Sequence, residues 1–130
     1  KRKEQVMSTV EAIRNKKDIE KVKDVLRKES ERNLLLFIMG INCGLRISDL
    51  LSLNVGDVKN KRYISLKEKK TGKFKKIPIN FVLKPMISKF VKNRSNKEPL
   101  FVSIFNTRLS RIMAYKIINS ACKKRKSEIC

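Results

Sequence analysis

The chain has 130 residues, with 33 Lys and Arg against 12 Asp and Glu, so its formal charge of +21 implies a polyanionic partner. Nucleic acid is the first candidate, and anionic lipid or an acidic protein is the second. This length suits one domain or part of one, and a composition with no His and no Cys-x-x-Cys excludes Ser-His and Cys-His catalytic pairs and argues against a zinc site.

Helical patterns fill the first part of the chain. Ser8 and Glu11 have the spacing of a capping box at a helix start, and apolar residues recur at helical spacing over residues 19–26. Residues 31–43 are apolar on nearly all sides, which predicts a helix buried in a core. Gly44 is the expected stop of that helix.

The pattern changes period in the middle of the chain. A shorter helix is predicted over residues 47–53, ending near Asn54 and Gly56. Residues 63–66 and 74–79 then alternate as two strands, which predicts a β-hairpin with a turn longer than two residues.

The last third of the chain returns to helical spacing. A second helical stretch is expected from residue 79 to residue 91, with Pro85 as a possible first helical residue. Residues 100–102 suit a short extended piece. Ser110 has the character of an N-cap for a final helix that ends in the basic run 123–126. The prediction is a mainly α fold with a small antiparallel hairpin, an α+β class.

The hairpin is the most basic segment, with six lysines in ten residues against the single acid Glu68. A hairpin projects its tip from the body, so these ammonium groups can follow a phosphate backbone. The alternative is a solvated strand pair whose lysines protect a sheet edge. The candidate DNA-binding lysines of the hairpin are Lys67, Lys69, Lys70, Lys73, Lys75 and Lys76.

Arg46 stands alone between the apolar helix and the next, shorter one. A guanidinium beside the free N–H groups of a helix start makes a phosphate site. Asp49, three residues on, can orient that guanidinium. The alternative is a purely structural Arg46–Asp49 pair that stabilises the turn.

Two segments resemble known motifs of the tyrosine recombinases, the phage-integrase family. Gly44-Leu45-Arg46-Ile47-Ser48-Asp49-Leu50-Leu51-Ser52-Leu53 looks like the first catalytic box. Lys70-Thr71-Gly72-Lys73-Phe74-Lys75-Lys76-Ile77-Pro78-Ile79 is similar to the family's β-hairpin. Leu100-Phe101 and the Ser110-Arg111 helix resemble the stretch before the second catalytic box, so the resemblance covers nearly the whole chain.

The resemblance implies a role for each matching residue. Arg46 would grip the non-bridging oxygens of the scissile phosphate, and Asp49 would support it. Lys70 would act as general acid to the leaving 5′-hydroxyl, with Lys69 or Lys73 as alternatives if the register is shifted. Arg108 and Arg111, near the start of the last helix, either contact DNA or are solvated.

The family also uses a His/Lys-x-x-Arg box, a later His or Trp, and a tyrosine nucleophile, which this chain does not match. Its two tyrosines, Tyr63 and Tyr115, precede the expected position, and Tyr115 suits a helix face better than a nucleophile. We therefore expect residues 1–130 to be a partial DNA breaking-rejoining catalytic domain, without the N-terminal DNA-binding domain and the C-terminal half. We expect both ends to be cut points in a longer protein, and the piece alone to bind DNA weakly and cleave nothing.

The function that the resemblance implies is site-specific DNA recombination or integration through a 3′-phosphotyrosyl intermediate, without a metal or other cofactor. Double-stranded DNA is the implied partner, with four protomers assembled on it in the whole protein. A non-enzymatic basic DNA-binding module or degenerate integrase remnant is the alternative, and a basic protein-interaction or ribosome-associated domain is a third.

Cysteine usage and hydropathy bear on the compartment. Three unpaired-looking cysteines, Cys43, Cys122 and Cys130, favour a reducing intracellular setting. The longest apolar run, Leu34 to Ile41, is far shorter than the ~20 residues of a membrane helix. We therefore expect a cytoplasmic, DNA-associated protein without a membrane partner.

Overall fold

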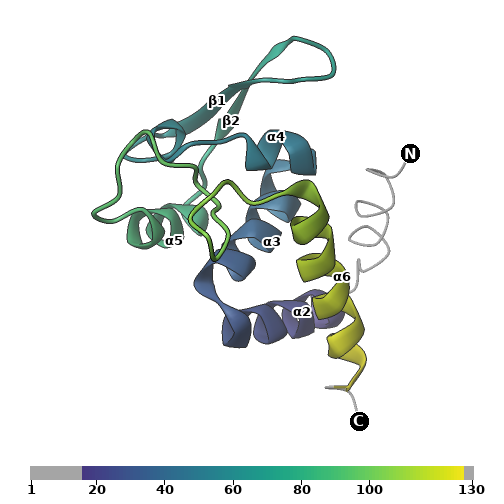
Figure 1. The fold of residues 1–130 in the computed structure, drawn as a ribbon. Helices are drawn as coiled ribbons and strands as arrows, with labels where there is room; N and C mark the ends of the chain where they lie inside the picture. Colours follow the sequence, from purple (N-terminus) through teal and green to yellow (C-terminus); the bar gives the residue numbers. More distant parts are fainter. Residues whose placement is uncertain (1–15, 128–130) are drawn as a thin grey trace.

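The computed structural model describes residues 16–127, beginning with helix α2 (Lys16–Glu29). The capping box expected at Ser8 and Glu11 lies outside the described residues. Helix α2 buries Val22, Val25 and Leu26, the apolar face that helical spacing predicted, and packs against α3 and α6. Figure 1 shows α2 at the opposite end of the molecule from the hairpin.

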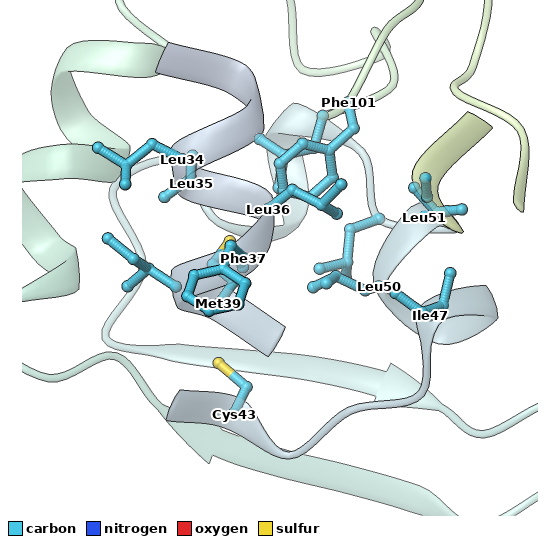
Figure 2. Close-up of a cluster of buried hydrophobic side chains, with 14 of the residues drawn as sticks. Leu34, Leu35, Leu36, Phe37, Met39, Cys43, Ile47, Leu50, Leu51 and Phe101 are labelled. Carbon is cyan, nitrogen blue, oxygen red and sulfur yellow. The ribbon is translucent and has the colours of Figure 1, made fainter. Parts of the chain in front are cut away.

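Helix α3 (Glu31–Cys43) lies at the centre of the core and contacts α2 and the helices that follow it. Ser30 caps its start, because its side-chain oxygen accepts the backbone N–H of Asn33 at 3.0 Å. Six consecutive residues from Leu34 to Met39 are buried, so the helix packs on every side, as predicted. Gly44 ends it in the left-handed conformation, with a φ of 64°, as expected of a helix stop. Figure 2 shows the side chains of α3 meeting those of the next helix and Phe101.

Helix α4 (Ile47–Leu51) is shorter than predicted, and the expected end near Asn54 and Gly56 is wrong. Ser52 and Leu53 donate their backbone N–H groups to carbonyls only three residues back, which closes the helix early. The chain then forms the 3₁₀ turn η1 (Val55–Asp57). Leu53 is buried although it lies outside the helix. Its apolar side chain therefore fitted the helical pattern in the sequence while its backbone is not helical.

Strands β1 (Tyr63–Lys67) and β2 (Phe74–Pro78) form the predicted antiparallel hairpin. Ile64 pairs with Ile77, and Lys67 pairs with Phe74. Ile64 and Leu66 are buried while their neighbours along β1 are exposed, so one face of the hairpin covers the core.

Helix α5 (Leu83–Phe90) follows the hairpin. The expectation that it begins at Pro85 is wrong by two residues. Asn80 accounts for the earlier start, because its side-chain oxygen accepts the backbone N–H groups of Val82 and Leu83 at 3.0 and 2.9 Å. Pro85 lies in the first turn, where its missing N–H leaves no helical bond unmade.

A return segment leads from α5 to α6 (Arg111–Ser127) and bonds to the chain just after α4. The backbone N–H of Val55 donates to Glu98 O at 2.8 Å, and that of Leu100 donates to Leu53 O at 3.0 Å. Ser110 caps α6 as predicted, because its hydroxyl oxygen accepts the N–H of Met113 at 3.1 Å.

The result is a mainly helical domain with one two-stranded sheet at its edge, in agreement with the predicted class. A single apolar cluster runs from α2 through α3 and α4 to α5 and α6. Within residues 16–127, no helix combines the length and apolar character needed to cross a membrane. The hairpin projects beyond the helices on the side of α4 (Figure 1).

Candidate functional site

Arg46 lies at the cap position of α4, with extended backbone, and its carbonyl oxygen accepts the N–H of Leu50 at 2.9 Å. The residues on both sides, Leu45 and Ile47, are buried and anchor the backbone in the core. The Arg46 side chain is half-buried, and it makes no ion pair or hydrogen bond within residues 16–127. Within this part of the chain, none of the five guanidinium N–H donors is used, so they are available to a ligand there.

Asp49 does not pair with Arg46 in the described part of the chain, so the alternative of a structural Arg46–Asp49 pair is not realised. Its carboxylate is 2 % exposed and instead accepts the backbone N–H of Lys69, with Oδ1 at 3.2 Å from that nitrogen. This bond joins α4 to the tip of the hairpin across 20 residues of sequence. Asp49 therefore ties the hairpin turn, which carries Lys70, to the helix that carries Arg46.

Replacing Asp49 by alanine should lower the free energy of unfolding by about 1–3 kcal/mol, because the part-buried hydrogen bond between its carboxylate and the backbone N–H of Lys69 is lost. Hydrogen exchange at the Lys69 amide should accelerate more than exchange in α2. Asp49→Asn keeps an acceptor oxygen and should lose less.

Asp24→Ala is the matched control, since Asp24 is exposed and pairs with Arg27 on the surface of α2, far from the hairpin. Unchanged stability and unchanged exchange at Lys69 in Asp49→Ala would contradict the tie between α4 and the hairpin.

The hairpin turn is organised by its only acid, Glu68. Its backbone N–H donates to Lys73 O, and its carbonyl oxygen accepts the N–H of Gly72, both at 2.9 Å. Its carboxylate accepts the Thr71 hydroxyl at 2.9 Å and lies 3.8 Å from the Lys75 ammonium. Gly72 has a φ of 72°, a conformation that suits glycine. Glu68 is thus occupied within the turn and leaves the other lysines as the exposed charge.

The six hairpin lysines are all exposed, as the sequence predicted. Two of them lie over aromatic rings of the hairpin: Lys67 Nζ is 5.8 Å from the centre of the Phe74 ring, and Lys76 Nζ is 4.4 Å from that of Tyr63. These contacts hold the charges on the outer face of the hairpin without neutralising them.

A cleft of about 560 Å³ lies where α4, the hairpin tip and the start of α6 meet. It brings together three of the predicted DNA-binding side chains, Lys69, Arg108 and Arg111, and none of the described residues that line it carries a carboxylate. The remaining lining residues are Ser48, Leu51, Ser52 and Leu109. The Ser52 hydroxyl already donates to Asp49 O at 2.6 Å, so the Ser48 hydroxyl and the cationic side chains are the groups that can accept a phosphate.

Arg108 also bonds to the end of α4. Its Nη1 donates to Leu51 O at 2.8 Å and to Leu53 O at 3.1 Å, and its Nη2 donates to Asn54 Oδ1 at 2.5 Å. These donors fix the segment before α6 against α4. Arg111 is exposed and lies 6.0 Å from the Tyr115 ring centre, so its charge stays available.

Neither tyrosine is placed like a nucleophile beside Arg46. Tyr63 lies on the outer face of the hairpin beneath Lys76. Tyr115 packs against the core, and its hydroxyl is buried without a hydrogen-bond partner among the described residues. Cys43 precedes Gly44 and is buried, and burial raises the pKa of its thiol, which disfavours the reactive thiolate.

Sequence reasoning did not single out Ser48 and Ser52 of the cleft or the exposed Phe74 of the hairpin. Helical spacing offers a signal for the serines, because residues four apart share a helix face. Strand alternation offers one for Phe74, because it is in register with the outward-facing Lys67. Among the described residues, no cluster of three metal-ligating side chains occurs.

Comparison with known proteins places this geometry in context. The model of a family described as the phage integrase family matches residues 11–129. The probable integrase/recombinase YoeC of Bacillus subtilis (strain 168) is 42 % identical over 116 residues, covering 88 % of this chain and 64 % of YoeC. The type 1 fimbriae regulatory protein FimE of Escherichia coli (strain K12) is 30 % identical over 97 residues, covering 69 % of the chain and 49 % of FimE. The chain therefore spans about half to two thirds of these relatives.

The fold also has solved counterparts. The structure of lambda integrase (residues 75–356) bound to DNA matches with a TM-score of 0.72 and 17 % identity, covering 86 % of this chain and 42 % of that one. A lambda integrase (75–356) dimer bound to a COC′ core site matches with a TM-score of 0.70 and 17 % identity, covering 85 % and 42 %. The arrangement of α3, α4, the hairpin and α6 is thus a known fold.

Proposed function

The chain belongs to the phage integrase family of tyrosine recombinases, and on this premise we propose that it forms one side of an active site for site-specific DNA cleavage and rejoining. The observation that carries the proposal is the pairing of two features. Arg46, at the start of α4, has no ion-pair or hydrogen-bond partner among residues 16–127, and Asp49 of the same helix holds the lysine-rich hairpin turn.

Arg46 would bind the scissile phosphate through its non-bridging oxygens. As a nucleophile adds to phosphorus, negative charge builds on these oxygens, and a planar guanidinium can donate two parallel hydrogen bonds to them. The rigid backbone between Leu45 and Ile47 limits the reorganisation that this requires. The residue therefore stabilises the transition state more than the ground state.

Lys70 would supply the proton for the leaving group. A deprotonated tyrosine oxygen bonds to phosphorus, the bond from phosphorus to the 5′-oxygen breaks, and the Lys70 ammonium gives that oxygen a proton to form a 5′-hydroxyl. The 3′-phosphotyrosyl bond conserves the energy of the broken bond, and attack by a 5′-hydroxyl reverses the steps. We propose that the tyrosine and the second arginine box lie in the part of the relatives' length that this chain does not span.

Duplex DNA is the proposed partner, bound by the hairpin lysines together with Arg108 and Arg111. Within the cleft, Lys69, Arg111 and the Ser48 hydroxyl would bind a backbone phosphate, while Arg108 holds α4 against the start of α6. We propose that the whole protein acts in the cytoplasm as a tetramer on DNA.

Removing hairpin lysines should flatten the salt dependence of duplex affinity. Each of Lys67→Ala, Lys73→Ala and Lys76→Ala should reduce the slope of log affinity against log salt by about 0.9 for each phosphate that the variant no longer neutralises. Fluorescence anisotropy of a labelled duplex over a salt series gives this slope.

Lys23→Ala provides the matched control, because Lys23 lies on α2, at the far end from the hairpin, and pairs with Glu20 at 3.1 Å. Its slope should equal that of the unsubstituted chain. If the hairpin variants keep the full slope as well, the phosphate contacts lie elsewhere and this DNA interface is wrong.

The enzymatic proposal is tested with the longest reading frame that contains this chain, incubated with a nicked suicide duplex. A denaturing gel reports covalent DNA–protein complexes. Salt-dependent DNA binding without any covalent complex would favour a non-enzymatic DNA-binding module over a recombinase.

A further inference from the structure

The outer face of the β1–β2 hairpin carries aromatic rings and ammonium groups in alternation. Tyr63 and Lys67 of β1 point to this face, because the alternate residues of the strand point into the core. Phe74 and Lys76 of β2 share the face, since Phe74 pairs with Lys67 in the strand register. The other two residues of the face are Ser65 and Pro78, so it contains no carboxylate.

Phe74 is the most exposed residue of this set with an apolar side chain, at 83 %. The described structure gives the ring one cation contact, the Lys67 ammonium at 5.8 Å from its centre. A ring this exposed gains little from the hydrophobic effect, so burial does not account for an aromatic residue here. Phe74 shares its face with Tyr63, which is 45 % exposed, and an exposed apolar patch rimmed by polar groups is typical of a binding surface.

The charge around Phe74 selects the kind of partner. Lys73 and Lys75 flank it in sequence and Lys67 lies beside it, while the nearest acid, Glu68, is occupied within the turn. A protein partner would have to be strongly acidic. Nucleic acid offers a partner both to the lysines and to the Phe74 ring. Its phosphates attract the ammonium groups, and its sugars and bases present apolar surface to the ring.

The position of Phe74 connects this face with the proposed active site. Asp49 binds the backbone of Lys69 and thereby holds the turn beside α4, and Phe74 is the first residue of β2 after that turn. The hairpin reaches over α4 in Figure 1. DNA that contacts the turn at Lys70 would therefore lie next to Phe74, four residues further along the chain.

We propose that Phe74 is a nonionic DNA contact, whose ring packs on the sugars and base edges of the duplex next to the cleavage position. This inference rests on the proposed function, since it takes duplex DNA as the partner. Phe74 would contribute affinity that does not depend on counterion release, in contrast to the lysines around it. It would also set how deeply the hairpin enters a groove, as apolar side chains of minor-groove binding proteins do.

The test measures duplex affinity over a salt series for the unsubstituted chain and for Phe74→Ala. We expect affinity to fall about five- to 150-fold at every salt concentration, in line with aromatic contacts to bases, with an unchanged slope against log salt. Phe74→Trp should retain most of the affinity. Because the side chain is exposed, thermal unfolding of all variants should match that of the unsubstituted chain.

Phe105→Ala is the matched control, since Phe105 is 80 % exposed but lies in the loop before α6. Its affinity should stay within about twofold of the unsubstituted chain, because it adds no hairpin contact. Equal affinity in Phe74→Ala and Phe105→Ala would overturn the proposal. A reduced slope in Phe74→Ala would also overturn it, because the ring would then act only by holding Lys67. Failure of the unsubstituted chain to bind duplex DNA would overturn the DNA interface of the proposed function as well.

Discussion

Replacing Arg46 by alanine should lower the rate of covalent DNA–protein complex formation by about 10²–10³-fold while most of the duplex affinity is kept. The guanidinium is proposed to act on charge that develops at the phosphate only during the reaction, and the hairpin lysines supply the general attraction for DNA. Single-turnover trapping with a nicked suicide duplex, in the longest reading frame containing this chain, measures the rate.

Two further variants sharpen this result. Arg46→Lys keeps the charge but loses the bidentate geometry, so it should recover only a small part of the rate. Arg27→Ala removes an exposed arginine of α2 that pairs with Asp24, and it should react like the unsubstituted protein. Covalent complexes that form at the full rate in Arg46→Ala would show that Arg46 does not bind the scissile phosphate.

Lys70→Ala should slow cleavage of an ordinary duplex by about 10²–10⁴-fold, the range expected for loss of a general acid. The same variant should cleave a duplex with a 5′-bridging sulfur at nearly the rate of the unsubstituted protein, because a thiolate leaves without receiving a proton. Comparing the two substrates in single-turnover experiments separates proton transfer from DNA binding.

Lys69→Ala and Lys73→Ala are the controls, because both residues are exposed lysines of the same turn. They should weaken binding but react alike with both substrates. Rescue of one of these variants instead of Lys70→Ala would move the general acid to that residue. A defect in Lys70→Ala that the sulfur substrate does not relieve would contradict acid catalysis by the hairpin.

Local patterns predicted most of the fold. The continuous apolar run of α3, its stop at Gly44 and the N-cap at Ser110 depend on residues within one or two helical turns. The end of α4 was not predictable in this way. Leu53 is buried although it lies outside the helix, so its apolar character does not tell where α4 ends. The backbone there bonds instead to the return segment, through Leu100 N–H to Leu53 O and Val55 N–H to Glu98 O.

The sequence allowed the residues of the candidate site to be predicted, but not the hydrogen bonds that join them to distant parts of the chain. Arg46 and Lys70 stand out because they match motifs, and these assignments stay predictions. The target of Asp49 is a backbone N–H 20 residues away, and Arg108 binds carbonyl groups 55 and 57 residues away. No periodicity carries such information, because tertiary packing brings these groups together.

The backbone hydrogen bonds between residues 53–55 and 98–100 bear on where the chain can tolerate insertions and deletions. They close a loop that contains the hairpin and α5, while α3, α4 and α6 meet outside it. The entropy cost of closing a loop grows only logarithmically, by about 0.6 kcal/mol for each doubling. Insertions in the turn beyond Lys69 or in the return segment therefore add little to that cost. The turn that is proposed to bind DNA can thus lengthen or shorten at little entropic cost while the backbone at Arg46 keeps its position.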